Sequence, residues 1–275
     1  MKKYFTMTWN ILKFVLIYLF FQLAAGILIS FYYIIKYYNS NLPAEEVQFI
    51  ITKNLYIPMA VASFFTLIIY ILIFKNKEEN LWQRCKFSIV DFNNTLMIVL
   101  VGTGAVAATS STVNLIQDKI ESYKTVSNNI SLGLGTIGGL ICVVIFIPIF
   151  EELLFRGLIF NELKKTINIA LSIIIQALIF GIFHGNLIQG VYTFILGVIL
   201  SIIYIWLDSI WAPIICHVTF NLMGTLIFPF LIYATGKYSI IFAPLGIATL
   251  IYGLINIKSF CNDKNNNLTG SPSMD

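Results

Sequence analysis

Charged residues are scarce in this sequence of 275 residues. They make up 11% of it, whereas hydrophobic residues make up 58% and the mean hydropathy is +0.86. Because a soluble domain averages about 25% charged residues, this composition excludes an ordinary soluble domain and predicts a polytopic membrane protein. The net charge of +4 arises from lysines and arginines between apolar runs, so it does not indicate a nucleic-acid partner.

Cysteine and histidine are also rare. The four cysteines show no paired spacing, and Cys142 and Cys216 lie inside apolar runs, which argues against a disulfide framework or a zinc ribbon. Only two histidines occur, His184 and His217. The sequence therefore offers few side chains for acid–base chemistry or metal binding, and both histidines become candidates.

Long apolar runs are abundant. A helix needs about 20 mostly apolar residues to cross the hydrocarbon core, and the N-terminal run is too long for a cleaved signal peptide. The run 166–207 has room for two helices, with a break at HGNLIQG (184–190). We predict an all-α polytopic membrane protein with about eight transmembrane helices. They are expected near 11–35, 55–74, 94–114, 133–158, 167–184, 188–207, 211–232 and 239–257.

We expect one transmembrane domain over 1–257 and a polar, disordered tail over 258–275. With the N-terminus inside, ten lysines and arginines fall in inner segments and five in outer ones. Positive residues favour the cytoplasm, so both termini are predicted to be cytoplasmic. The Ile-, Lys- and Asn-rich composition suits an AT-rich bacterial genome and hence a bacterial cytoplasmic membrane. The oligomeric state cannot be inferred from the sequence.

Two glycine-rich stretches lie within the apolar runs. GLGTIGG (133–139) has the GxGxxG spacing of a dinucleotide site, but no βαβ unit surrounds it. We interpret it, together with VGTGAVAATSST (101–112), as small residues that let helices approach closely.

PIFEELLFRG (148–157) brings three charges to the end of an apolar run. An ionised residue at mid-helix costs about 2.5–3.5 kcal/mol, so these charges need partners or water. Glu152 and Arg156 are four residues apart and can pair on one helix face. Glu151 lies roughly 140° round the helix from Arg156 and is left for another role, such as a general base. The alternative is a cytoplasmic helix end where all three charges meet water.

Both histidines lie in helical patterns with a partner four residues away. Phe180 and His184 share a face in FGIFHG, and His217 and Asn221 share one in CHVTFN. A lone intramembrane histidine is more often a satisfied core residue than a catalyst. Two histidines with an aligned asparagine, and a glutamate–arginine cluster on a third helix, instead predict one polar cavity inside the membrane.

That set supplies the parts of a peptide hydrolase that activates water. Glu151 can take a proton from the water while His184 holds it, and His217 and Asn221 can donate hydrogen bonds to the developing oxyanion. Alternatively, Glu151, His184 and His217 are candidate zinc ligands. The zinc-protease motif HExxH is absent, so the cofactor is either none or zinc.

In their order, three motifs resemble those of the CPBP intramembrane proteases, which include type II CAAX prenyl endopeptidases and Abi-type bacteriocin-immunity proteins. EELLFR (151–156) matches EExxxR, FGIFH (180–184) matches FxxxH, and HVTFN (217–221) matches HxxxN. The resemblance covers about 130–235. It implies that Glu151 is the base, His184 its water-binding partner, and His217 and Asn221 the oxyanion donors. The supporting residues are then Glu152, Arg156 and Phe180.

The sequence thus predicts an intramembrane endopeptidase that cleaves a hydrophobic peptide or a membrane-anchored protein in the lipid bilayer. A non-catalytic bacteriocin-immunity membrane protein is the main alternative. A proton-coupled transporter would use the same acids as a relay, but the inverted pair of broken helices typical of such transporters is absent from the pattern.

Overall fold

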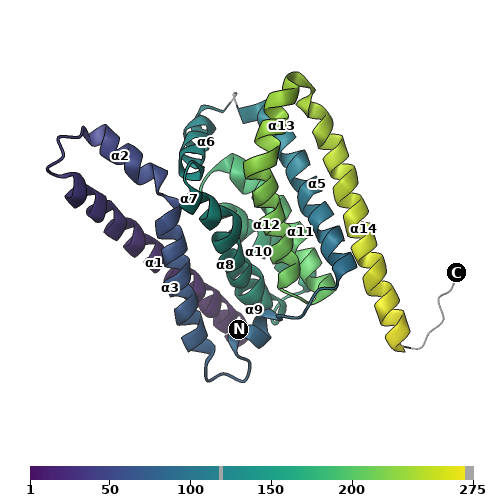
Figure 1. The fold of residues 1–275 in the computed structure, drawn as a ribbon. Helices are drawn as coiled ribbons and strands as arrows, with labels where there is room; N and C mark the ends of the chain where they lie inside the picture. Colours follow the sequence, from purple (N-terminus) through teal and green to yellow (C-terminus); the bar gives the residue numbers. More distant parts are fainter. Residues whose placement is uncertain (118–119, 270–275) are drawn as a thin grey trace. The chain divides into compact units, whose positions relative to one another are not determined.

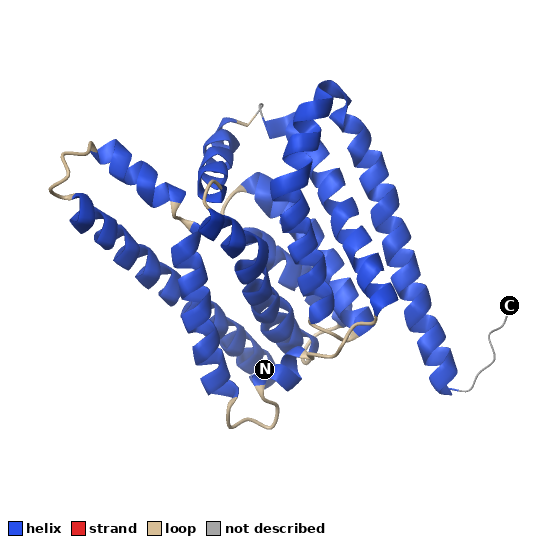
Figure 2. Cartoon of the chain, viewed as in Figure 1, coloured by secondary structure: helices blue, strands red, loops and turns tan. Residues whose placement is uncertain are grey.

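The structure, a computed structural model, describes residues 1–117 and 120–269, and Figure 2 shows helices and loops with no strand among them. The predicted all-α fold is therefore confirmed. The chain forms two compact units: Met1–Cys85 with Ile120–Ser172, and Lys86–Lys119 with Ile173–Asp275. We call them the first and second units. The expectation of one transmembrane domain over 1–257 stays a prediction beside this division.

The first unit contains the long N-terminal helix and the segment that carries the paired glutamates (Figure 1). Its helices are α1 (Lys2–Tyr37), α2 (Ala44–Lys53), α3 (Tyr56–Phe74), α4 (Leu81–Cys85), α6 (Glu121–Leu134), α7 (Ile137–Ile141), η2 (Cys142–Phe146), α8 (Ile147–Glu152), η3 (Leu153–Phe160) and α9 (Asn161–Lys164).

The second unit carries both histidines. Its helices are α5 (Phe92–Ile116), most of α10 (Ile169–Ile182), α11 (Leu187–Leu207), α12 (Trp211–Leu222), η4 (Met223–Ile227), α13 (Phe228–Thr235), η5 (Gly236–Ile241) and α14 (Phe242–Thr269).

Within the described residues, six helical runs are long and apolar enough to cross a membrane, so the count of eight is not confirmed. One difference is α10, whose 14 residues extend about 21 Å at 1.5 Å per residue, less than the roughly 30 Å hydrocarbon core. The other is the helical run Trp211–Asn262, which includes both the seventh and the eighth expected span.

Helix also occurs where the sequence did not predict it. The segments between the expected spans contain α2 and α6, and α14 continues to Thr269, well into the expected tail at 258–275. A helix gains one hydrogen bond for each residue added, and the first glycine or proline after residue 257 is Gly270. Residues 270–275 lie outside the described part of the chain.

Small residues bring the helices of the second unit close together, with α5 lying between α12 and α14 (Figure 1). A Cβ atom on Gly104 would lie 2.6 Å from the backbone oxygen of Gly246, and one on Gly102 would lie 2.7 Å from that of Cys216. The interpretation of residues 101–112 as a packing face is therefore confirmed. In the other stretch, Gly133 packs on the ring of Tyr56. The helix is interrupted in this stretch, between the end of α6 and the start of α7.

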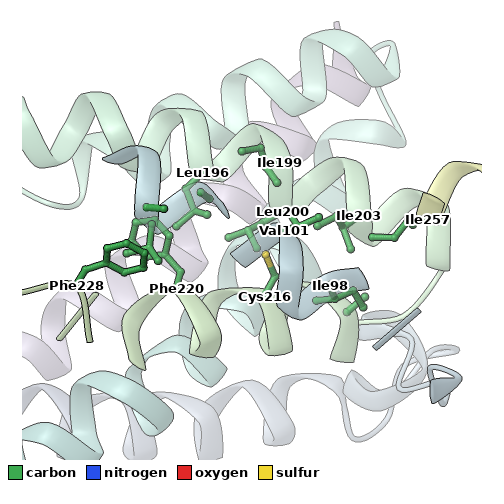
Figure 3. Close-up of a cluster of buried hydrophobic side chains, with 14 residues drawn as sticks. Ile98, Val101, Leu196, Ile199, Leu200, Ile203, Cys216, Phe220, Phe228 and Ile257 are labelled. Carbon is green, nitrogen blue, oxygen red and sulfur yellow. The ribbon is translucent and has the colours of Figure 1, made fainter. Parts of the chain in front are cut away.

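The apolar core of the second unit surrounds the contacts of α5 with α12 and α14, and Figure 3 shows its larger side chains. They come from α5, α11, α12, α13 and α14 and are fully or almost fully buried. Residues Ile98, Val101, Leu196, Leu200, Ile203, Cys216 and Phe220 are among them.

A polar clamp holds the turn between α11 and α12. Asp208 ends α11 in the left-handed region (φ 49°), and its carboxylate pairs with Lys86, itself at φ 59°. The Ser88 hydroxyl donates to the Asp208 carbonyl at 2.6 Å, and the Ile210 amide donates to the Lys86 carbonyl at 2.9 Å. The clamp sets where α12, the helix of His217, begins.

A buried ion pair holds α4 against the end of the glutamate-bearing helix in the first unit. The Arg84 guanidinium pairs with the Glu162 carboxylate, which also accepts a hydrogen bond from Asn10 at 2.8 Å. The Asn161 amide donates to the Arg84 carbonyl at 2.8 Å. Burial in the same place raises the pKa of Cys85 to about 12, so this thiol is unreactive at neutral pH.

We predict that Arg84→Met lowers the free energy of unfolding by about 3–5 kcal/mol, because Glu162 is left buried with its charge uncompensated. Thermal or denaturant unfolding in detergent measures the change. The matched control is Lys165→Ala, which removes an exposed pair with Glu79 at 3.9 Å and should cost less than about 1 kcal/mol. Equal losses in both variants would contradict the prediction.

We also predict that Gly104→Ala destabilises the second unit by about 1–3 kcal/mol through overpacking against α14. Gly26→Ala on α1 is the control, because its Cβ would meet nothing within 4 Å. It should keep or raise the unfolding temperature, since alanine is the better helix former. An unchanged unfolding temperature for Gly104→Ala would show that α5 and α14 pack less closely than described.

Candidate active site

The glutamates lie in a helical run that changes its winding around them. α8 ends at Glu152, and the π-helix η3 begins at the next residue and continues for eight residues. A second π-helix, η2, precedes α8. π-helical turns are rare and occur frequently at functional sites, so the backbone marks this segment independently of its charges.

The ion pair expected from the four-residue spacing is confirmed. Arg156 Nη1 donates to Glu152 Oε1 at 2.8 Å, and both side chains are completely buried. Charges removed from water are tolerated when they are paired and hydrogen-bonded. The alternative in which all three charges meet water is thereby corrected for Glu152 and Arg156.

Glu151 is half-buried, and its surroundings differ from the expectation in two ways. The i→i+5 bonding of η3 brings residues five apart closer together, so the 140° rotation from Arg156, derived for an ideal α-helix, is too large. In addition, the Tyr18 ring on α1 packs on Phe150, the residue before Glu151, with centroids 4.8 Å apart. The segment that carries this glutamate is therefore packed against a distant helix.

In the second unit, His184 lies in the turn that follows α10 and not within the helix predicted over 167–184. Its Nδ1 lies 2.9 Å from the Phe180 carbonyl oxygen. A carbonyl can only accept, so this bond places a proton on Nδ1, and neutral His184 presents Nε2 as an acceptor. The imidazole is thus oriented by the end of its own helix.

Two neighbours that the sequence analysis missed hold the His184 turn. Gly185 adopts φ +72°, a left-handed conformation that glycine adopts readily. Asn186 accepts from the Gln189 amide at 2.9 Å as the N-cap of α11, and its side-chain amide donates to the His184 carbonyl at 3.2 Å. Asn followed three residues later by Gln resembles a capping box, a signal that was present in the sequence.

The structure brings both histidines to one aromatic ring. The Phe180 ring centroid lies 5.0 Å from that of His184 and 5.7 Å from that of His217, with interplanar angles of 82° and 90°. Edge-to-face contact at these distances is the preferred aromatic geometry. Phe180 is fully buried, so it fixes two imidazoles from separate elements in one neighbourhood of the second unit.

Asn221 follows His217 by one turn of α12, and both residues lie in its α-helical part, just before η4 begins at Met223. Residues four apart on an α-helix share a face. His217 is buried and Asn221 is half-buried. The His217 imidazole and the Asn221 amide therefore lie on the same face of α12.

The predicted site residues are thus divided: Glu151, Glu152 and Arg156 belong to the first unit, and His184, His217 and Asn221 to the second. A zinc site made of Glu151, His184 and His217 would need both units. Among the described residues, no three His, Cys, Asp or Glu side chains gather as a metal-ligand group within one unit.

A separate groove of about 350 Å³ runs along α1 and includes none of the predicted site residues. It is lined by Gln22, Leu23, Gly26, Ile27, Ser30, Phe31 and Ile34.

Comparison with known proteins finds a family to which part of the chain is similar. Residues 133–223, about a third of the chain, match the family model of type II CAAX prenyl endopeptidase Rce1-like proteins. The matched segment, which we call the Rce1-like core, is similar to the CPBP intramembrane proteases. This core contains every predicted site residue and lies within the range 130–235 expected for it.

A curated protein is similar to part of the chain. The chain is 34% identical over 74 residues to the protein named "Putative membrane peptidase YdiL" of Bacillus subtilis (strain 168). The alignment covers 27% of this chain and 30% of that protein. No solved structure matches the chain.

We predict that Phe180→Leu shifts the NMR signals of both imidazoles, because each loses an edge contact worth about 0.5–1.5 kcal/mol. With only two histidines in the chain, isotope-labelled histidine gives two resolvable sets of signals. Phe228→Leu is the control, since the Phe228 ring packs on Phe242, and it should leave both sets in place. A shift confined to His184 would contradict the shared contact.

Proposed function

We propose that this protein is an intramembrane endopeptidase that cleaves a hydrophobic peptide or a membrane-anchored protein with water activated by Glu151 and His184. The observation that carries the proposal is the contact of both imidazoles with Phe180, inside the Rce1-like core. A satisfied core histidine needs no second histidine beside it. Two of them, in a chain with no others, support a chemical role.

In the proposed reaction, the Glu151 carboxylate takes a proton from water as the oxygen attacks the scissile carbonyl carbon. The His184 Nε2 acceptor, oriented through the bond from Nδ1 to the Phe180 carbonyl, holds the second hydrogen of that water. The charge of Glu152 is neutralised by Arg156. Of the two neighbouring glutamates, Glu151 is therefore the one proposed to exchange protons.

The carbonyl oxygen becomes negatively charged as the tetrahedral intermediate forms. His217 and the Asn221 amide are proposed to donate hydrogen bonds to it, which stabilises charge that develops only in the transition state. When the intermediate collapses, the C–N bond breaks and the proton held by Glu151 passes to the leaving amine. One carboxylate thus acts first as base and then as acid.

A zinc ion held by Glu151, His184 and His217 would supply Lewis-acid activation of the same water. The proposal assigns the proton transfers to Glu151 in the form of the site without this ion, since a carboxylate that ligates zinc is not free to act as the base. Treatment with a chelator, followed by readdition of zinc, distinguishes the two forms of the site.

The Ile-, Lys- and Asn-rich composition supports a location in the bacterial cytoplasmic membrane, and the lysine and arginine distribution supports cytoplasmic termini. The partners in this proposal are the lipid bilayer and a peptide or membrane-anchored protein substrate. The orientation of the two ends is tested with the variants Lys2→Cys and Lys258→Cys, whose thiols are labelled in intact cells and in lysed cells.

We predict that Glu151→Ala and His184→Ala each lower kcat by at least about 10²–10⁴-fold, the contribution typical of general acid–base catalysis. The assay is cleavage of a fluorogenic apolar peptide by purified protein in detergent. Thr249→Ala, which removes a hydroxyl that donates to the Leu245 carbonyl on α14, is the control and should retain activity if the protein still unfolds at a similar temperature. Full cleavage activity in both site variants would reject the assignment of these residues, whereas a wild-type protein that cleaves no peptide would favour a non-catalytic immunity role.

A further inference from the structure

One end of the first unit carries an excess of positive charge. The start of α1, the connection between α3 and α4, and the end of α9 meet there, since Asn10 donates to Glu162 at 2.8 Å and Lys165 lies 3.9 Å from Glu79. We call this the basic end. Its eight cationic residues are Lys2, Lys3, Lys13, Lys75, Lys77, Arg84, Lys164 and Lys165, and its three acidic residues are Glu78, Glu79 and Glu162.

The glutamates of the basic end compensate little of its charge. Glu162 is buried in its pair with Arg84, and Glu79 lies at the edge of ion-pair distance from Lys165. Five lysines of α1 and of the connection between α3 and α4 make no ion pair with any described residue. They are Lys2, Lys3, Lys13, Lys75 and Lys77.

The opposite end of the same unit is balanced. The end of α1 and the helices α2 and α6 carry three lysines and three glutamates, namely Lys36, Lys53, Lys124, Glu45, Glu46 and Glu121. The 36 residues of α1 extend about 54 Å at 1.5 Å per residue. This length far exceeds the screening distance of about 8 Å at physiological salt, so the charges of one end do not compensate those of the other.

Exposed aromatic and apolar side chains adjoin the lysines of the basic end. Trp9 on α1 is 58% exposed and Trp82 on α4 is 47% exposed, and tryptophan is enriched where a membrane meets water. Further into the helices, Leu12 and Leu16 on α1 and Leu72 on α3 are also exposed. The surface therefore changes from cationic to apolar within about two helical turns.

An aromatic contact brings cations of α1 and α3 to the same level. Lys13 Nζ lies 5.4 Å from the centroid of the Phe14 ring, and this ring lies 5.9 Å from that of Phe74, centroid to centroid. Lys75 directly follows Phe74, and the Arg84 guanidinium lies 5.2 Å from the Phe74 ring. One anionic group can therefore meet lysines from two helices.

We propose that the basic end binds the phosphate groups of anionic phospholipids, through the lysines of α1 and of the connection between α3 and α4. An anionic phospholipid matches both parts of this surface, because its phosphate meets the lysines and its acyl chains meet the exposed leucines. An acidic soluble protein would match the charge alone. Each lysine near an anionic membrane surface strengthens the attraction about five-fold. The inference does not depend on the proposed cleavage reaction.

The experiment measures the unfolding temperature of the purified full chain in detergent micelles that contain added phosphatidylglycerol, or phosphatidylcholine with the same acyl chains. We expect phosphatidylglycerol to raise it more, and added salt to weaken the difference. Combining Lys3→Gln, Lys75→Gln and Lys77→Gln should raise the phosphatidylglycerol concentration needed for half of the effect by about 10- to 100-fold. These lysines are exposed, so the unfolding temperature in phosphatidylcholine should stay near the wild-type value.

The matched control combines Lys36→Gln, Lys53→Gln and Lys124→Gln, which removes the same charge from the opposite end. It should leave the response to phosphatidylglycerol unchanged. Equal stabilisation by the two lipids, or an equal loss of response in both triple variants, would overturn the inference. Inorganic phosphate or a polyglutamate peptide that stabilises the protein as well as phosphatidylglycerol does would also overturn it, because the surface would then bind anions without selecting a lipid.

Discussion

The ion pair between Glu152 and Arg156 lies where neither side chain reaches solvent. Removing either partner would leave a charge that apolar surroundings cannot solvate, so the two must stay together on one helix face. The pair lies within one helical run, so it turns with α8 and η3 and marks the face of that run that is buried. With Glu152 held by Arg156, Glu151 is directed by the same backbone to a second set of surroundings, where Tyr18 and Phe150 meet.

The same constraint explains the buried pair of Arg84 and Glu162, whereas the pair of Lys86 and Asp208 is exposed to solvent. Arg84 pairs with Glu162 where α4 meets the end of the glutamate-bearing helix, and Asp208 pairs with Lys86 where α11 turns into α12. Each pair joins segments that are far apart in the sequence, and each lies next to an element that carries a motif residue. Apolar packing brings helices together without selecting a register, whereas hydrogen-bonded charges select one.

The sequence predicted the features that depend on the spacing of residues near one another in the chain. Charge-free runs located most helices because a membrane span needs length and apolarity, and the four-residue spacing of Glu152 and Arg156 or of Phe180 and His184 predicted contacts within a turn. Spacing cannot tell which helix packs beside another, so Tyr18 and the pairing of Arg84 with Glu162 were missed. The π-helices were missed for another reason. Their wider turn is a compromise with tertiary packing, and no single residue in LLFRGLIF requires it.

The shortness of α10 has a consequence for how water can reach a site inside a membrane. The helix follows Lys164 and Lys165, charges that belong at the level of the headgroups, and covers only about two thirds of the hydrocarbon thickness. If α10 starts at that level, the turn at His184 ends inside the hydrocarbon layer, where backbone groups must be satisfied by the protein itself. The His184 amide donates to the Gly181 carbonyl at 3.1 Å and the His184 carbonyl accepts from Asn186 at 3.2 Å, which meets that requirement. Local thinning of the bilayer is one way to accommodate so short a helix, and it would shorten the path of a hydrolytic water from the opposite aqueous phase.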